Sequence, residues 1–236
     1  MDSPQRVRIL TDPLSLISSN RLVSFLNPQN LNHVLSDKQF VQDIDFCVDS
    51  GFLCWLIRLR WNIRVARFSF DFAGIADEYF QFCEKSGVPL AIIGATDTEL
   101  RLFVEKIKVK YPRINLKYTH HGYFDGSGRD QVVRSLLELG IESVVVGLGV
   151  PKQEEFLCHI KDRGYQGSAY TCGAFISQTA KSENLHYYPK FVNQLRIRFL
   201  YRLYFEPHTR RRYFTNFLPN LVRFVTHVKP QLVREG

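Results

Sequence analysis

The run Val144-Val145-Val146-Gly147-Leu148-Gly149-Val150-Pro151-Lys152-Gln153-Glu154-Glu155 decides the fold of this chain of 236 residues. Consecutive valines predict a buried β-strand, and the residues after Pro151 predict a helix that the proline opens. Glycines between a strand and a helix let a ligand approach the backbone, and free amides at a helix N-terminus favour an anion. The run therefore predicts a phosphate-binding turn, although plain connectors in α/β proteins have the same pattern.

On both sides of this turn, short apolar runs alternate with helical periods. The expected strands are residues 22–26, 45–48, 90–93, 115–118, 143–147 and 168–171. The expected helices are residues 30–35, 52–59, 75–85, 98–110, 129–139 and 152–163. This alternation predicts an α/β fold, a Rossmann-like layered arrangement with a largely parallel sheet flanked by helices.

Positive charge is concentrated in the last fifth of the chain. Residues 190–236 contain ten Lys or Arg against two Asp or Glu, which accounts for the whole net charge of +8. Apolar residues such as Phe199 and Leu203 recur there at helical spacing beside a basic face. We therefore expect a Rossmann-like domain over residues 1–189 and a basic amphipathic helical appendage over residues 190–236 that associates with a membrane surface. An ordinary helix that packs on the domain is the alternative.

The cysteines and the apolar runs indicate the compartment. The five cysteines are odd in number and lie mostly in apolar runs without a Cys-x-x-Cys pair: Cys47, Cys54, Cys83, Cys158 and Cys172. This pattern predicts reduced core thiols in a cytoplasmic protein. Since the chain also lacks a signal-peptide pattern and an apolar run of about 18 residues, we expect neither secretion by a recognisable route nor a membrane span.

Polar side chains follow several expected strands at the point where each strand ends. Asn27, Asp49 and Thr96 occupy such positions. Because parallel strands place their carboxyl ends at one edge, where open α/β sheets bind ligands, we expect these residues to converge with the turn at residues 147–154 on one rim.

Further motifs connect these residues with a known family. They are Asn27-Pro28, Val48-Asp49-Ser50-Gly51, Gly94, Tyr111-Pro112, His121-Gly122-Tyr123-Phe124, the turn at residues 147–154, Phe199-Leu200-Tyr201-Arg202-Leu203 and Glu206-Pro207. In this order they resemble the WecG/TagA/CpsF glycosyltransferases (glycosyltransferase family 26) over residues 20–215.

The resemblance implies an activity, partners and a location. The activity is inverting transfer of a sugar from a UDP-sugar donor to a polyprenyl-diphosphate-linked sugar in bacterial surface or exopolysaccharide biosynthesis. The reaction is metal-independent and needs no cofactor. The enzyme is cytoplasmic and peripheral on the inner face of the cell membrane, and a homo-oligomer is compatible with the same apolar tail.

The resemblance also implies that Asp49 is the general base that takes the proton of the acceptor hydroxyl. The family carries this aspartate in a short Asp-Gly segment, whereas Ser50 stands between Asp49 and Gly51 here. From the residues alone, Asp49 is equally an N-cap of the following helix. Asn27 matches a family asparagine near the donor sugar, and its alternative role is that of a turn residue before Pro28.

Other residues are expected to bind nucleotide or substrate. They are Gly94, Thr96, Gly147, Gly149, Lys152, Gln153, Glu154, Ser177 and Gln178, together with Arg202, Arg210, Arg211 or Arg212 of the appendage. Guanidinium groups suit the diphosphate because they stay charged and bind phosphate oxygens bidentately. For Lys152 the alternative is a solvated side chain without a ligand.

Two departures from the family pattern leave the donor open. Arg67 and Asp71 lie in a segment that only partly matches, so they line the pocket as in the family or form a structural salt bridge. Ile176 stands where many relatives carry an aspartate. The donor sugar is therefore undetermined among glucose, galactose, a uronic acid and an N-acetylmannosamine type.

Competing functions have weaker support. A nicotinamide-dependent oxidoreductase requires a third fingerprint glycine where Lys152 stands. A nucleic-acid-binding module could use residues 210–214, but no known nucleic-acid-binding motif accompanies them, and we expect no nucleic-acid partner. Asp43 and Asp45 have the Asp-x-Asp form of metal-dependent glycosyltransferases, yet they precede their strand, so we expect no metal there.

Overall fold

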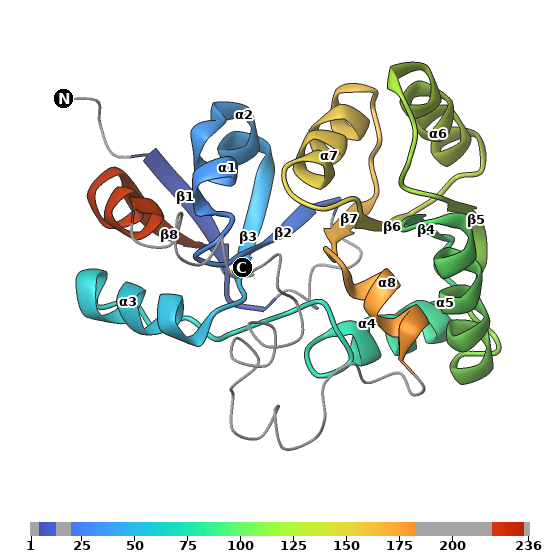
Figure 1. Ribbon diagram of the computed structural model, residues 1–236, viewed down its shortest axis with the longest axis horizontal. Helices are drawn as coiled ribbons and strands as arrows, with labels where there is room; N and C mark the ends of the chain where they lie inside the picture. The colour runs from blue at the N-terminus through green and yellow to red at the C-terminus, as the bar shows by residue number, and fades with distance from the viewer. Residues whose placement is uncertain (1–4, 13–19, 183–218, 234–236) are drawn as a thin grey trace.

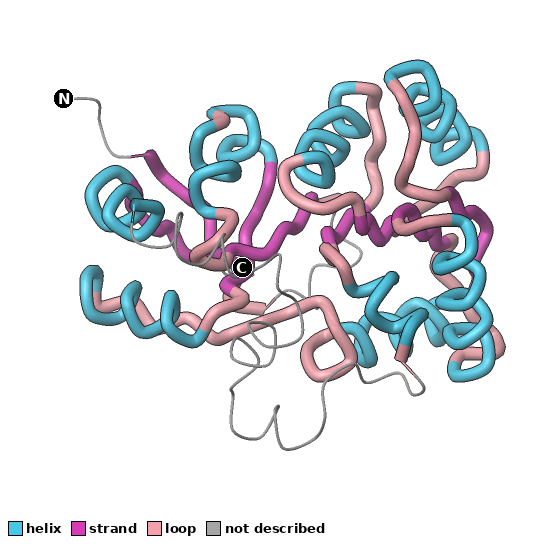
Figure 2. Tube along the Cα trace, in the orientation of Figure 1, coloured by secondary structure: helices cyan, strands magenta, loops and turns pink. Residues whose placement is uncertain are grey.

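The computed structural model describes residues 5–12, 20–182 and 219–233. In these residues one sheet of eight parallel strands runs through the molecule, with helices on both faces (Figure 1). The strands lie in the order β5-β4-β6-β7-β2-β3-β1-β8. Figure 2 shows the strands as a band between two layers of helices. The expected α/β fold is confirmed, and every strand pair is parallel.

The strands and helices expected between residues 22 and 171 form, with small shifts at their ends. The strands are β1 Gln5–Leu10, β2 Leu22–Leu26, β3 Ile44–Val48, β4 Leu90–Gly94, β5 Leu116–His120, β6 Ser143–Gly147, β7 Ser168–Thr171 and β8 Val228–Val233. The helices are α1 Leu31–Ser36, α2 Lys38–Asp43, α3 Gly51–Trp61, α4 Ala76–Ser86, α5 Asp97–Lys110, α6 Gly126–Glu138, α7 Lys152–Asp162 and α8 Phe175–Lys181. Residues 219–227 are also helical.

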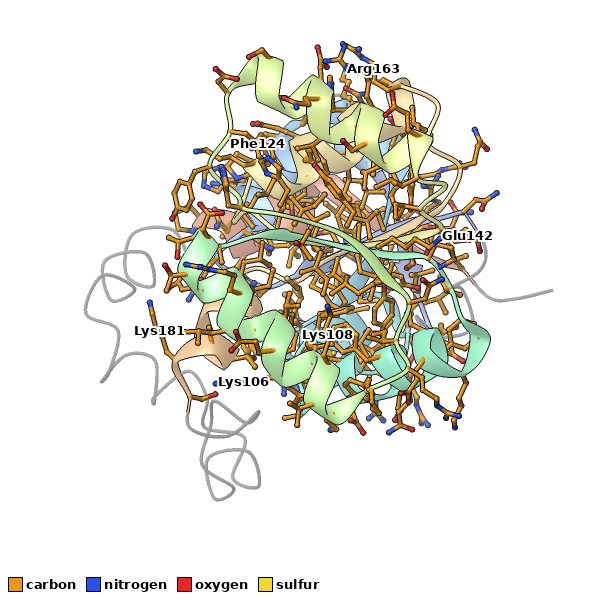
Figure 3. The ribbon with its side chains drawn as sticks, turned by 90° about the vertical axis from the view of Figure 1, so that its right-hand side faces the viewer. Lys106, Lys108, Phe124, Glu142, Arg163 and Lys181 are labelled. Carbon is orange, nitrogen blue, oxygen red and sulfur yellow. The ribbon has the colours of Figure 1, made fainter. Side chains whose placement is uncertain are left out.

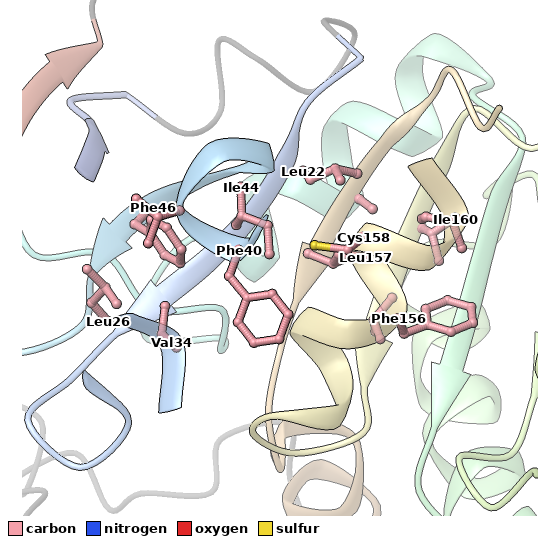
Figure 4. Packing of buried hydrophobic residues seen from close by; sticks show 14 of the residues in the cluster. Leu22, Leu26, Val34, Phe40, Ile44, Phe46, Phe156, Leu157, Cys158 and Ile160 are labelled. Atoms are coloured by element: carbon pink, nitrogen blue, oxygen red, sulfur yellow. The ribbon is translucent and has the colours of Figure 1, made fainter. Parts of the chain in front are cut away.

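Helices bury the central strands on both faces, which explains their continuous apolar sequences. Val144 and Val146 of β6 face the cluster formed with α1, α2, α6 and α7. Val145 faces the other cluster, formed with α4, α5 and α8. Figure 4 shows part of the first cluster, in which Phe40 of α2 lies between β3 and α7.

The strands β1 and β8 and the helices α2 and α8 lie outside the elements expected from the sequence. β1 and β8 pair from Gln5↔Val228 to Leu10↔Val233 and form one edge of the sheet. Pro230 is tolerated in β8 because an edge strand has no further partner for its N–H groups. In β1, Val7 and Ile9 alternate with arginines, and this period of two is the signal that predicts a strand.

Part of the range assigned to the appendage packs on the domain. Phe224 of the helix at residues 219–227 is fully buried and meets the ring of Trp61 edge-on, with centroids 5.5 Å apart. β8 then completes the sheet. Residues 190–218 and 234–236 lie outside the described residues, so the division at residue 189 and the membrane contact of the appendage stay predictions. Among the described residues, no helix has both the length and the apolar character needed to cross a bilayer.

All five cysteines are free, as expected. Cys47, Cys83 and Cys158 are buried, and Cys54 and Cys172 are half-buried. Burial raises the pKa of Cys54 to about 11 and the pKa of Cys83 and Cys158 to about 12. The thiols therefore stay protonated at neutral pH, which fits core residues.

Candidate active site

The ends of β4 and β6 form a switch point of the sheet. The helix that follows β4, α5, packs on one face, and the helix that follows β6, α7, packs on the other (Figure 1). Connections that diverge from adjacent strand ends create the crevice in which open α/β sheets bind ligands. Gly94 at the end of β4 and Gly147 at the end of β6 are paired at this point.

Steric contacts require glycine at both positions. Gly94 has φ +147°, and a Cβ on it would lie 2.5 Å from the carbonyl oxygen of Gly147. A Cβ on Gly147 would lie 2.9 Å from Cδ1 of Ile176 and 3.0 Å from Sγ of Cys172. Backbone rather than side chains therefore lines the rim here, which is the kind of surface that a phosphate group can approach.

Thr96 and Ser177 are brought together by Glu99, a residue that the sequence analysis missed. Thr96 caps α5: its Oγ1 accepts from Glu99 N at 3.3 Å, and its own N–H donates to the Glu99 carboxylate at 3.2 Å. Ser177 Oγ donates to the same carboxylate at 3.0 Å. The hydrogen bond from Lys181 is the main reason that the pKa of Glu99 falls to about 2. The Thr-x-x-Glu spacing of a capping box is the signal that predicts this cluster. Gln178, the next residue of α8, is half-buried.

The turn between β6 and α7 is open to solvent on its outer side. Gly149 has φ +74°, and nothing lies within 4 Å of a Cβ built on it. α7 begins at Lys152, with Pro151 as its N-cap residue, and Gln153 N donates to the Gly149 carbonyl at 3.0 Å. Lys152 is exposed. The turn thus presents a helix N-terminus at the rim, as the sequence predicts.

Glu154 and Gln153 lie beneath this turn, with 0% and 4% of their surface exposed. Glu154 Oε1 accepts from Ser24 Oγ at 2.7 Å and from Gln153 Nε2 at 2.9 Å. Thr171 Oγ1 donates to Ser24 Oγ at 2.9 Å, so the network joins β2, β7 and α7 below the rim. Glu154 has no exposed surface, and this burial favours a positioning role for its side chain over direct contact with a ligand.

The burial of Glu154 makes the stability of the protein depend on pH. Desolvation raises the pKa of Glu154 above the ordinary value of 4.5. Between 4.5 and the raised pKa, the folded state therefore holds this proton more often than the unfolded state does, and the free energy of unfolding decreases as pH rises through that window. Glu154→Gln mimics the protonated acid and keeps the Oε1 acceptor. We expect it to gain stability relative to the wild type as pH rises above 4.5, and not below.

Urea midpoints measured across this pH window test the prediction. Glu155→Gln removes an exposed carboxylate from the same helical turn and is the matched control. A difference between Glu154→Gln and the wild type that stays constant with pH would contradict the prediction.

Asp49 lies on the same rim, at the end of β3. Its N–H donates to the Leu26 carbonyl at 2.8 Å, and its Oδ1 accepts from Nε and Nη2 of Arg67 at 3.2 and 2.8 Å. Ser50 caps α3, because its Oγ accepts from Leu53 N at 3.3 Å. The alternative that Asp49 is the N-cap is therefore wrong: the inserted serine takes that role, and the carboxylate faces a guanidinium instead.

The backbone brings Arg67 to Asp49. Residues 67 and 68 run alongside the end of β3, with Phe68 N donating to the Val48 carbonyl at 3.0 Å. The side chains of Arg67 and Asp49 are 32% and 24% exposed. Asp71 shapes the following turn, where its Oδ1 accepts from Ala73 N at 2.8 Å. Arg67 therefore forms an ion pair, and this ion pair lies at the rim.

The loop that carries Asn27 is held from the other end of the chain. Asn27 Oδ1 accepts from Gln29 N at 3.0 Å and from Asn30 N at 3.3 Å, which makes Asn27 a turn residue. Asn220, which is 1% exposed, donates from Nδ2 to the Pro28 carbonyl at 3.0 Å. Local sequence patterns do not reveal this contact, because it joins residues 192 positions apart.

The structure thus places these predicted site residues in two groups on one rim. Gly94, Thr96, Gly147 and Gly149 lie at the ends of β4 and β6. Asn27 and Asp49 lie at the ends of β2 and β3. Three strand spacings, about 14 Å, separate β6 from β3. Arg202, Arg210, Arg211 and Arg212 lie outside the described residues.

Asp43 and Asp45 lie at the opposite end of β3. Asp43 pairs with Lys161 at 2.6 Å. Asp45 is 2% exposed and pairs with Arg8 and with Arg21, the latter at 2.6 Å. The Asp-x-Asp motif is therefore engaged in ion pairs away from the rim.

A hollow of about 660 Å³ lies next to the rim, between α1, α2, the start of α7 and the helix at residues 219–227. Its lining includes His33, Lys38, Glu155 and Arg223. Its described lining includes Pro151 of the predicted phosphate turn, but neither the glycines of that turn nor Asn27, Asp49 or Thr96. We therefore place the candidate site at the strand ends, where the glycines and Asp49 lie.

The parallel sheet, the switch-point crevice and the strand-end carboxylate are typical of an α/β enzyme that binds a phosphate-bearing ligand. The profile of the Glycosyl transferase WecG/TagA/CpsF family matches residues 4–234, and the chain belongs to this family. It is similar to the UDP-Gal:alpha-D-GlcNAc-diphosphoundecaprenol beta-1,4-galactosyltransferase of Shigella boydii, with 28% identity over 207 residues, covering 87% of this chain and 86% of the relative. The family and the glycosyltransferase activity expected from the motifs are confirmed.

Proposed function

We propose that this glycosyltransferase moves a sugar, with inversion, from a UDP-sugar to a polyprenyl-diphosphate-linked sugar in bacterial surface polysaccharide assembly. The observation that carries the proposal is the position of Asp49 at the rim, where Ser50 and not Asp49 caps α3. The Shigella boydii relative supports the substrate class, because its name specifies UDP-Gal and a GlcNAc-diphosphoundecaprenol acceptor. Galactose is therefore the first donor to test, and N-acetylglucosamine the first acceptor sugar.

The donor fits the rim with its nucleotide end at β4 and β6. The backbone at Gly94 and Gly147 leaves room for the nucleoside end. The N-terminus of α7, whose Glu154 reaches Ser24 of β2 next to β3, favours the diphosphate. A nucleoside diphosphate sugar is an extended molecule, and about three strand spacings lead from this crevice to β3. The reacting sugar then lies toward Asp49.

In the reaction, the Asp49 carboxylate takes the proton of the acceptor hydroxyl while the hydroxyl oxygen bonds to the anomeric carbon. The bond from that carbon to the diphosphate oxygen breaks on the opposite side, and UDP leaves with the electron pair. This opposed geometry inverts the configuration of the carbon. Arg67 orients the carboxylate through its two hydrogen bonds.

Positive charge for the departing diphosphate comes, in this proposal, from Arg202, Arg210 and Arg211 instead of a metal ion. The described residues on both sides of this segment are anchored to the domain. Lys106 donates to the Ser182 carbonyl at 2.6 Å, and Figure 3 shows Lys106 and Lys181 where α5 and α8 meet. Asn220 is anchored on the loop of Asn27.

The identity of the donor sugar depends on the region under Gly147. Ile176 is 1% exposed there, so the aspartate of many relatives is replaced by a buried apolar side chain. A buried isoleucine offers no hydrogen bond to an N-acetyl group. This favours galactose or glucose over an N-acetylmannosamine type.

Release of UDP from a panel of UDP-sugars tests the proposal. The panel contains UDP-galactose, UDP-glucose, UDP-glucuronic acid and UDP-N-acetylmannosamine, each with a short-chain lipid diphosphate carrying N-acetylglucosamine, in EDTA. We expect acceptor-dependent release from one hexose donor. Release without acceptor would show hydrolysis, and loss of turnover in EDTA that added divalent metal restores would contradict the metal-independent chemistry.

A further inference from the structure

Helix α3 has two apolar faces, of which only one is in the core. Leu53 and Ile57 are fully buried. Phe52, Trp55 and Leu59 are 42%, 56% and 68% exposed. Residues at these spacings share one face of a helix, which lies opposite to Leu53 and Ile57. We call Phe52, Trp55 and Leu59 the outer stripe.

Cations surround the outer stripe, and acidic residues are absent from its segment. Residues 50–70 contain Arg58, Arg60, Arg64 and Arg67 but no Asp or Glu. Arg58, Arg60 and Arg64 are exposed. At 3.6 residues per turn, Arg58 and Arg60 fall on either side of the stripe. The outer face of α3 is therefore apolar along its middle and positive along both sides.

Four other exposed apolar side chains of the described residues lie close to a carboxylate in the sequence. Leu102 and Val109 lie on α5 together with Glu105. Leu137 and Leu139 flank Glu138. Val222 lies in a segment without carboxylates but has no ring, and Tyr123 lies two residues from Asp125. Trp55 combines an amphipathic ring with a segment free of carboxylates. Such a combination is typical of a helix at a lipid–water interface.

We propose that the outer face of α3 docks on an anionic lipid bilayer. Trp55 and Leu59 enter the interface, and Arg58, Arg60 and Arg64 contact lipid phosphates. Because α3 begins two residues after Asp49, docking holds the end of β3 at the membrane surface. Delivery of a lipid-linked acceptor to Asp49 is a consequence that rests on the proposed function, whereas the docking itself does not.

The chain carries its own reporter for this surface. Its two tryptophans are Trp55 and Trp61. Trp61→Phe retains an aromatic ring against Phe224 and leaves Trp55 as the sole indole. With vesicles of phosphatidylcholine and phosphatidylglycerol, we expect the emission of Trp55 to shift to shorter wavelength and to be quenched by brominated acyl chains. Trp55→Phe, whose remaining Trp61 is half-buried, is expected to show no such quenching.

Substitutions on the surface test the charge and the apolar stripe separately. Arg58→Gln, Arg60→Gln and Arg64→Gln are expected to weaken partitioning on the order of fivefold per cation removed. The matched control is the set Arg101→Gln, Lys108→Gln and Lys117→Gln, which removes exposed cations elsewhere. Trp55→Ser with Leu59→Ser is expected to weaken partitioning about tenfold or more, against Leu102→Ser with Val109→Ser as control.

Three outcomes would overturn the docking proposal. The first is binding of the full chain to vesicles with an unquenched Trp55, since another segment would then make the contact. The second is a blue shift that depends on protein concentration without lipid, which would assign the stripe to a second copy of the chain. The third is a loss of partitioning in the control variants that equals the loss in the matched variants of α3. Quenching in a protein that transfers no sugar would contradict the proposed function and leave docking intact.

Discussion

Replacing Asp49 by asparagine is expected to lower the rate of UDP release by about 10²- to 10⁴-fold, the usual contribution of a general base. The amide keeps the shape of the side chain but cannot take the acceptor proton. Stability is expected to change by about 1 kcal/mol or less, because the ion pair with Arg67 is partly exposed. Measurement of turnover together with urea unfolding separates the two effects.

Ser50→Ala is the matched control, since it changes the adjacent residue and is expected to affect stability instead of turnover. Loss of the Ser50 cap is expected to destabilise α3 by about 1 kcal/mol while turnover stays near that of the wild type. Asp49→Asn is thus expected to lower turnover with little loss of stability, and Ser50→Ala to lower stability with little loss of turnover. Full turnover of Asp49→Asn would transfer the role of base to another residue of the rim, and equal loss of stability in both variants would make Asp49 structural.

Replacing Gly94 by alanine is expected to destabilise the protein by about 3–5 kcal/mol, the combined cost of backbone strain and overpacking. Its φ of +147° is rare for residues with a side chain, and the new Cβ would lie 2.5 Å from the Gly147 carbonyl oxygen. β4 and β6 are paired neighbours inside the sheet, so the backbone cannot move aside cheaply. Because domains are stable by only about 5–15 kcal/mol, a large loss of soluble protein and of activity follows.

Substitutions at two other glycines distinguish the cost of backbone strain from the cost of a steric clash of the new Cβ. Gly87 has φ +65° and Gly149 has φ +74°, and nothing lies within 4 Å of a Cβ on either. Gly87→Ala and Gly149→Ala are therefore expected to cost about 1–2 kcal/mol each, the cost of a left-handed conformation for a residue with a side chain. Gly149→Ala is also expected to raise the KM for the UDP-sugar, since it crowds the proposed phosphate turn. A urea midpoint of Gly94→Ala equal to that of Gly87→Ala would show that the close approach of β4 and β6 is not required.

Most of the central sheet could be predicted because its signals are local. The strand at residues 143–147 follows from three adjacent valines, and the helix after it follows from Pro151. β8 could not be predicted in the same way, since Pro230 weakens its pattern and its partner β1 lies at the other end of the chain. The helix α8 is short, and its contacts with α5 decide its position.

The candidate site was predictable in composition but not in arrangement. Asn27, Asp49 and Thr96 follow strands in the sequence, and the structure places them on one rim. The burial of Glu154 could not be predicted, because the first turn of a helix is usually exposed and the hydrogen bond from Ser24 of β2 joins residues 130 positions apart. The role of Ser50 as the cap in place of Asp49 likewise depends on backbone geometry.

By itself, the sequence determined the alternation of strands and helices, the glycine turn at residues 147–149 and membership in the glycosyltransferase family, because periodicity and motifs are properties of neighbouring residues. Only the tertiary structure decided that Gly94 meets Gly147, that Arg67 pairs with Asp49 and that Asn220 holds the loop of Asn27. Each of these contacts joins residues far apart in the chain. Their formation depends on how the sheet and helices pack together, which no local pattern encodes.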